Sequence, residues 1–131
     1  MKRHSDWMQL ALESARSASE QGEVPVGAVI VSSDNRLLAV GANRREQDCD
    51  PTAHAEIVAI REACRLRQDW RLPDCTLYVT LEPCPMCAST ILQSRIALLV
   101  YGCDDLKAGA IASVLNLPND PSSFHRLQVI S

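Results

Sequence analysis

The apolar residues of the chain recur with two spacings, one typical of helices and one typical of strands. After Ser5 and Asp6, apolar side chains fall three to four residues apart as far as Gln21, and Gly22 follows. Residues at this spacing line one face of a helix. Serine or aspartate can cap the start of a helix, and glycine often ends one. The pattern predicts a first helix that Ser5 or Asp6 caps and that ends near Gln21.

Short apolar runs indicate strands. Residues 26–31 and 37–42 are two such runs, and the turn residues Ser33, Asp34 and Asn35 lie between them. This arrangement predicts a hairpin. Three later runs are also expected to be strands: residues 76–80, 96–101 and 127–130.

Prolines indicate the starts of two internal helices. Asp50-Pro51 places a capping oxygen before a proline, which predicts a helix from this point to about Arg67. Pro83 and Pro85 predict the start of a second helix, which continues to about Ser94. Both helices follow a predicted strand.

The order of these elements predicts one α/β domain over residues 1–131. The helix between the strands at 76–80 and 96–101 implies a right-handed crossover that joins parallel strands. The early hairpin adds an antiparallel pair, so the five-stranded sheet should be mixed. A short helix is also expected at residues 110–115.

Composition and charge narrow the class of protein. The 131 residues suit one domain, and 47% hydrophobic with 22% charged residues is typical of a folded globular protein. The net charge of −3 argues against extensive non-specific binding of nucleic acid. No apolar run approaches the roughly 20 residues of a membrane helix. The first residues are charged without an apolar segment, unlike a secretory signal, so a cytoplasmic location is expected.

The chain has six cysteines. A reducing cytosol argues against disulfides. Cys84 and Cys87 are interpreted as metal ligands, and the other four as free thiols. Three of those four lie in apolar segments and are expected to be small core residues: Cys64, Cys75 and Cys103.

The candidate chemistry lies in His54, Glu56, Cys84 and Cys87. One imidazole and two thiolates can fill three corners of a zinc tetrahedron and leave the fourth for water, as in catalytic zinc sites. A carboxylate two residues after the histidine is suited to proton transfer. Cysteines three apart at a helix start share one face, and the helix dipole there favours thiolates.

The cysteines allow two other interpretations. Pro-Cys-x-x-Cys after a strand is also found in thioredoxin-like redox pairs. That interpretation leaves His54 and Glu56 without a role. A structural zinc site would need two more ligands, and the remaining cysteines are single and poorly spaced. The joint occurrence of all four residues at two helix starts favours catalytic zinc.

Four segments resemble those of a known family: residues 23–29 (EVPVGAV), 50–57 (DPTAHAEI), 76–87 (TLYVTLEPCPMC) and 107–110 (KAGA). They resemble the cytidine deaminase superfamily and, within it, the bacterial tRNA-adenosine deaminase branch. The resemblance implies a three-layer α/β/α fold, a homodimer and one Zn²⁺ per subunit. It also implies hydrolytic deamination of adenosine to inosine in a tRNA anticodon loop.

The resemblance also assigns roles to residues. It implies that His54, Cys84 and Cys87 bind zinc and that Glu56 shuttles protons. A base contact from Asn43, a contact of Asp105 with the RNA backbone, and a pocket lined by three apolar residues are also implied: Val26, Ala55 and Leu81. Outside the resemblance, Asn43 could be a turn residue at a strand end and Asp105 an exposed loop charge.

Two departures from the family leave the substrate open. The chain stops at Ser131, where family members usually continue into a C-terminal helix, and Asp104 adds a second acid beside Asp105. Arg44, Arg45 and the arginines between residues 61 and 71 offer positive surface, or else a solvated helix face. A deaminase of a free nucleobase or nucleoside, of the guanine or cytosine type, is the first alternative. A non-catalytic, zinc-stabilised RNA-binding partner subunit is the second, and the presence of Glu56 argues against it.

Overall fold

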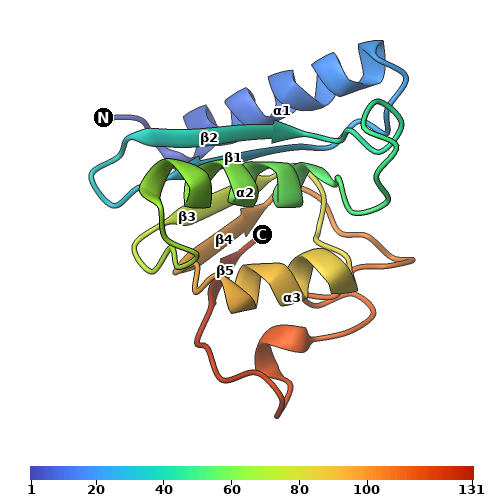
Figure 1. Cartoon of the computed structure of the whole chain (residues 1–131). Helices are drawn as coiled ribbons and strands as arrows, with labels where there is room; N and C mark the ends of the chain where they lie inside the picture. Colours follow the sequence, from blue (N-terminus) through green and yellow to red (C-terminus); the bar gives the residue numbers. More distant parts are fainter.

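The computed structural model describes residues 1–131, and a five-stranded sheet forms its middle layer (Figure 1). The strand order is β2-β1-β3-β4-β5, with β1 antiparallel to both β2 and β3, while β3, β4 and β5 run parallel. The strands are β1 (Gly27–Val31), β2 (Leu37–Ala42), β3 (Thr76–Val79), β4 (Leu98–Tyr101) and β5 (Gln128–Ile130). The predicted mixed sheet is confirmed, and the strand bounds differ from the predicted ones by at most two residues.

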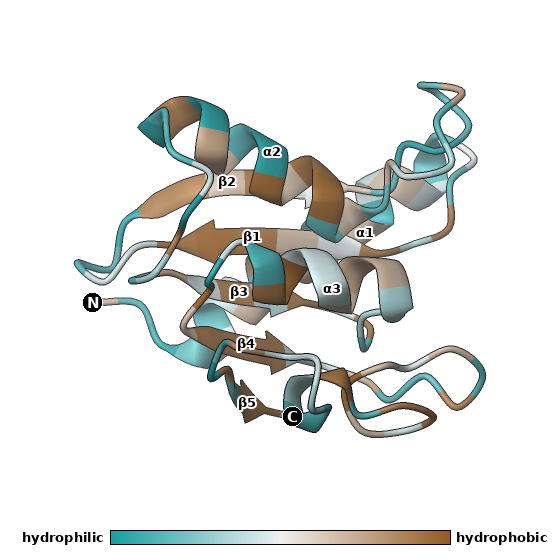
Figure 2. Ribbon diagram, turned by 60° about the horizontal axis from the view of Figure 1, so that its bottom comes forward, coloured by the Kyte–Doolittle hydropathy of each residue, from teal (hydrophilic) through white to brown (hydrophobic).

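Helices cover both faces of this sheet. Helix α1 (His4–Glu20) packs on one face, where Trp7 and Ala11 join Val29, Tyr78 and Val100 in a small buried cluster. Helices α2 (Ala55–Arg67) and α3 (Pro85–Gln93) lie on the other face and share the larger core with the opposite side chains of β1, β3 and β4. These central strands are mostly apolar (Figure 2). The result is the predicted three-layer α/β/α arrangement, and none of its helices is long and apolar enough to cross a membrane.

Two predicted helix starts are wrong. Helix α1 begins at His4 with Arg3 as its N-cap, and Asp6 accepts a hydrogen bond from the Arg3 amide (2.9 Å), so neither Ser5 nor Asp6 is the cap. Helix α2 begins at Ala55 and not at residue 51. Asp50 Oδ1 accepts from the amide of Thr52 (2.8 Å), two residues on, and this closes a turn instead of opening a helix.

The later start of α2 has a consequence for the functional residues. His54 becomes the N-cap of the helix, with extended backbone, and Glu56 becomes its second residue. Close packing against β2 sets the position of this end, because a side chain at Gly41 would lie 2.3 Å from the carbonyl oxygen of Ala55. Glycine is therefore needed where α2 meets the sheet.

The predicted helix at residues 110–115 is also wrong. This segment forms turns, and a short 3₁₀ helix follows at Leu117–Asn119. The amides of residues 111–113 donate to the carboxylate of Glu82 in place of carbonyls within a helix. Cys75 is buried as predicted and Cys64 partly so, but Cys103 is exposed, and all six cysteines are free thiols.

Candidate active site

The starts of α2 and α3 meet on one face of the sheet, and each supplies metal-ligating side chains (Figure 1). His54 caps α2, Cys84 caps α3, and Cys87 lies one turn into α3. His54 Nδ1 lies 3.6 Å from Cys84 Sγ and 3.5 Å from Cys87 Sγ. The structure thus brings His54, at the start of α2, together with two cysteines of α3 that lie 30 and 33 positions further along the chain.

The spacing of these three donor atoms suits zinc. Bond lengths of about 2.3 Å to sulfur and about 2.0–2.1 Å to nitrogen, at tetrahedral angles, place neighbouring sulfur and nitrogen ligands about 3.6 Å apart. The two nitrogen–sulfur distances match that value, and all three atoms lie within 4.8 Å of one another. Two thiolates and one imidazole are also ligands that zinc prefers. The residues present therefore fit a zinc ion with one open position.

The start of α3 favours a thiolate. A hydrogen bond from Cys87, aided by the backbone amides of Cys87 and Met86, lowers the pKa of the Cys84 thiol to about 5, and this outweighs the opposing effect of burial. Cys87 keeps its proton to donate this hydrogen bond to Cys84, so the same bond raises the pKa of the Cys87 thiol. Free amides at a helix N-terminus stabilise negative charge. The site is thus prepared electrostatically for a cation.

Glu56 lies beside these ligands and is almost completely buried, with 4% of its surface exposed. Burial raises the pKa of its carboxyl group to about 7, and the nearby Cys84 thiolate acts in the same direction. The only groups that stabilise its charged form are its own backbone amide and Cys87. A carboxyl group in this state can take up and release a proton near neutral pH.

A pocket opens onto this cluster. The structure places most of the predicted site residues in its wall, together with His54, Glu56 and Cys84: Val26, Asn43, Leu81 and Asp105. Cys87 does not line the pocket, and Ala55 is the exception among the predicted substrate-binding residues. Ala55 is fully buried in the core between α2 and the sheet and does not line the pocket.

Four lining residues were not predicted: Val24, Arg45, Glu82 and Ala108. All four lie outside the helices and strands, where apolar periodicity gives no signal. Glu82 lies shortly after an apolar strand and directly before Pro83-Cys84. It is buried, with 2% of its surface exposed.

The carboxylate of Glu82 is saturated with donors. It accepts from the amides of Asp105, Ile111, Ala112 and Ser113 and from the Ser113 hydroxyl. Burial alone would raise the pKa of this carboxyl group, but the Ser113 hydroxyl and the amides outweigh it and lower the pKa to about 2. Glu82 is therefore an anion at neutral pH within the pocket wall.

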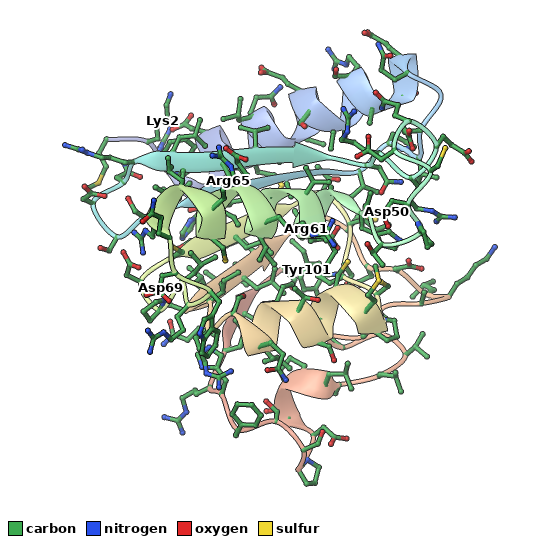
Figure 3. The ribbon with its side chains drawn as sticks, viewed as in Figure 1. Lys2, Asp50, Arg61, Arg65, Asp69 and Tyr101 are labelled. Carbon is green, nitrogen blue, oxygen red and sulfur yellow. The ribbon has the colours of Figure 1, made fainter.

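The arginines near the site are mostly neutralised. Arg44 pairs with Asp48 (3.0 Å) and Arg61 with Asp50 (3.5 Å), and the remaining pairs on and after α2 are Arg65–Glu62, Arg67–Asp74 and Arg71–Asp69. Arg61 and Arg65 lie along α2, with Asp50 and Asp69 near its two ends (Figure 3). This series therefore forms a solvated, charge-balanced face. Arg45 makes no ion pair and lines the pocket.

The fold and the His54, Cys84 and Cys87 cluster define a zinc-binding deaminase domain, and comparison with known proteins agrees. The family model for the cytidine and deoxycytidylate deaminase zinc-binding region matches residues 1–103. The chain belongs to this family, and within it to the branch of the tRNA-specific adenosine deaminases.

The relatives support this branch over the whole chain. The tRNA-specific adenosine deaminase of Haemophilus influenzae is 48% identical over 95% of this chain and 72% of its own length. That of Agrobacterium fabrum is 47% identical over 100% of this chain and 86% of its own length. A structure from work on A-to-I editing by tRNA:A34 deaminases at the wobble position has a TM-score of 0.94, with 48% identity and 97% of each chain covered. A guanine deaminase from Bacillus subtilis is more distant, with a TM-score of 0.76, 38% identity, and 79% of this chain and 66% of that one covered.

Proposed function

We propose that this protein is a zinc-dependent hydrolytic deaminase that converts adenosine to inosine in the anticodon loop of tRNA. The observation that carries this proposal is the convergence of His54, Cys84 and Cys87 beside the buried Glu56, at the base of one pocket. The substrate follows from the tRNA-specific adenosine deaminases that the chain resembles over 93–100% of its length. We further propose that two copies of the chain form the active homodimer, as the family resemblance implies.

One Zn²⁺ per chain would be held by His54 Nδ1 and the Sγ atoms of Cys84 and Cys87. A zinc ion in such a site supplies Lewis acidity, which makes water a competent nucleophile at neutral pH. The pocket that would receive the base is lined by two of these three residues, His54 and Cys84. The chemistry of the remaining steps belongs to residues of the chain.

Glu56 moves the protons. Its carboxylate accepts a proton from the water whose oxygen bonds to C6 of adenine, and it returns this proton to the ring nitrogen N1. A second proton passes through Glu56 from the new hydroxyl group to the exocyclic amine, the C6–N6 bond breaks, and ammonia leaves. Adenosine and water thus become inosine and ammonia, with no change of oxidation state.

The pocket residues orient the base. Val26 and Leu81 offer apolar surface to its ring, and the amide of Asn43, which is buried at the pocket wall, offers hydrogen bonds to its edge. Asp105 lies at the mouth, where the RNA backbone beside the target base would pass. One of its oxygens is engaged by the amides of Lys107 and Ala108, and the other is free to accept from a ribose hydroxyl. The base must leave its stack to enter, at a cost of about a few kcal/mol.

Deamination of a free base is the second candidate, because the structural likeness to guanine deaminase is substantial. The two can be separated by supplying the zinc-loaded protein with four substrates: an anticodon stem-loop with adenosine at the wobble position, free adenosine, guanine and cytosine. We expect inosine and ammonia from the stem-loop alone. Turnover of guanine without turnover of the stem-loop would overturn the proposal.

Two controls sharpen this experiment. A stem-loop with the adenosine moved to the neighbouring position tests whether the protein reads the loop and not adenosine alone. Removal of about one equivalent of zinc with a chelator should abolish turnover, and added zinc should restore it. Full activity at less than about a tenth of an equivalent of metal would contradict the zinc assignment, and a monomer mass in light scattering would contradict the homodimer.

A further inference from the structure

The most densely hydrogen-bonded carboxylate of the pocket is not the one that moves protons. Glu82 directly precedes Pro83-Cys84, and its two oxygens accept five hydrogen bonds. Four come from backbone amides, namely those of Asp105 (3.1 Å), Ile111 (3.1 Å), Ala112 (2.9 Å) and Ser113 (3.0 Å). All of these donors lie in one segment, more than 20 residues further along the chain.

That segment, residues 105–113, has no helix or strand of its own. Its amides therefore lack the carbonyl acceptors that a helix or strand would provide. The Glu82 carboxylate accepts their hydrogen bonds instead. The segment also closes tightly over the carboxylate, because a Cβ atom at Gly109 would lie 2.4 Å from Glu82 Cδ. Two further bonds complete the fold of the loop, from the amide of Gly109 to the carbonyl of Asp105 and from that of Ala110 to the carbonyl of Pro83, both 2.9 Å.

The same segment forms one side of the pocket mouth. Asp105 and Ala108 line the pocket, and the loop between them carries the exposed Leu106 and Lys107. A substrate larger than a free base must pass this side. One buried anion thus joins the strand that leads to the zinc ligands with the loop that faces the substrate.

We propose that Glu82 is a positioning residue, which holds residues 105–113 so that Asp105 and Ala108 face an RNA substrate at the pocket mouth. The proposal rests on the tRNA deaminase function proposed above. Glu82 takes no part in the proton transfers, since all its acceptor positions are directed to the loop. Its effect should therefore fall on substrate binding and leave the chemical step largely intact.

Glu82→Gln tests this directly, because it keeps the shape of the side chain but replaces one acceptor oxygen with a donor that opposes the loop amides. With zinc-loaded protein we expect the KM for the stem-loop to rise at least about 10-fold, while kcat changes by less than about 3-fold and zinc content stays the same. Hydrogen exchange of the amides of residues 111–113 should become faster. Glu20→Gln, which removes an exposed charge at the end of α1, is the matched control and should change none of these.

An unchanged KM with unchanged exchange would overturn the proposal, as would a fall in kcat equal to the fall in kcat/KM. If Glu82→Gln fails to fold, Ser113→Ala removes only the hydroxyl donor, and we expect a KM about 3-fold higher with slightly faster exchange. A wild-type KM for Ser113→Ala would then overturn the proposal. If the wild-type protein turns over no stem-loop, the proposed function is wrong. In that case the hydrogen exchange of residues 111–113 alone decides whether Glu82 holds the loop.

Discussion

Glu56 and Glu82 line the same pocket and are both almost completely buried, yet the pKa values of their carboxyl groups move in opposite directions. That of Glu56 rises to about 7, and that of Glu82 falls to about 2. Burial acts to raise both, so the difference comes from hydrogen-bond donors. Glu82 has five directed at it, whereas Glu56 has only its own amide and Cys87.

The contrast between the two groups shows how one pocket separates chemistry from architecture. A group that exchanges protons must not be saturated with donors, because each donor to the anion makes reprotonation harder. A group that holds a loop must be saturated, because each unfilled acceptor leaves an amide of the loop without a partner. Glu56 meets the first condition at the start of α2, and Glu82 meets the second at the junction of β3 and α3.

The largest expected effect comes from Glu56→Gln. This change keeps the volume of the side chain but removes the acceptor of the proton, so kcat should fall at least about 10³-fold, roughly 4 kcal/mol of barrier. Zinc content should stay at the wild-type value, since Glu56 is not among the three ligands. Single-turnover deamination together with metal analysis measures both. A variant that kept kcat within about 10-fold of wild type would remove the distinction between the two glutamates.

The next effect concerns stability at acid pH and belongs to Glu82. The pKa of its carboxyl group is about 2 in the folded protein, against 4.5 for an ordinary glutamate, so it stabilises the fold above about pH 4.5. This contribution, at most about 3 kcal/mol, is lost as the pH falls through the folded value near 2. Urea unfolding at pH 7, 5 and 3 should therefore show a gap between wild type and Glu82→Gln that narrows only at the lowest pH. A gap that stayed constant down to pH 3 would show that the charge of Glu82 does not hold the loop.

The residues that would bind the metal and move protons could be predicted from sequence, because they lie close together in pairs along the chain. His54 and Glu56 are two residues apart, and Cys84 and Cys87 are one helical turn apart, so short spacings alone place them together at helix starts. The sheet could be predicted equally well, because short apolar runs and the turn residues between them indicate strands directly. Even the wrong start of α2 left His54 and Glu56 at that helix end, since the error moved the boundary by only four residues.

The contacts that hold the loop at residues 105–113 could not be predicted from sequence. Glu82 acts on backbone amides, which every residue except proline carries, so its partners at residues 111–113 have no sequence signature. The same donors explain why a helix was wrongly expected at residues 110–115. The resemblance places Ala55 in the pocket, and only the packing of the folded chain shows that this residue is fully buried in the core.

The opposite side of the mouth repeats the arrangement with a weaker anchor. Glu23, which is also buried, accepts from the amides of Glu46 (3.1 Å) and Gln47 (2.8 Å) in the loop that carries Arg45. These amides lower the pKa of Glu23 against the effect of burial. Glu23 thus accepts two hydrogen bonds, whereas Glu82 accepts five. Arg45 is thus held at the mouth less firmly than Asp105, and its charge is free of any ion pair.

The smallest expected effect is therefore that of Arg45→Ala. If the side chain meets one phosphate of the stem-loop, its removal should reduce the salt dependence of binding by about 0.7 in the logarithmic slope. The KM for the stem-loop should then rise about 3-fold at 50 mM salt and converge with wild type as salt is added, while kcat stays the same. Arg44→Ala is the matched control, because Arg44 is already paired with Asp48 and should change KM less. An equal effect of both variants at every salt concentration would mean that the two sides of the mouth do not differ in how they meet RNA, and that the loop held by Glu82 carries the recognition alone.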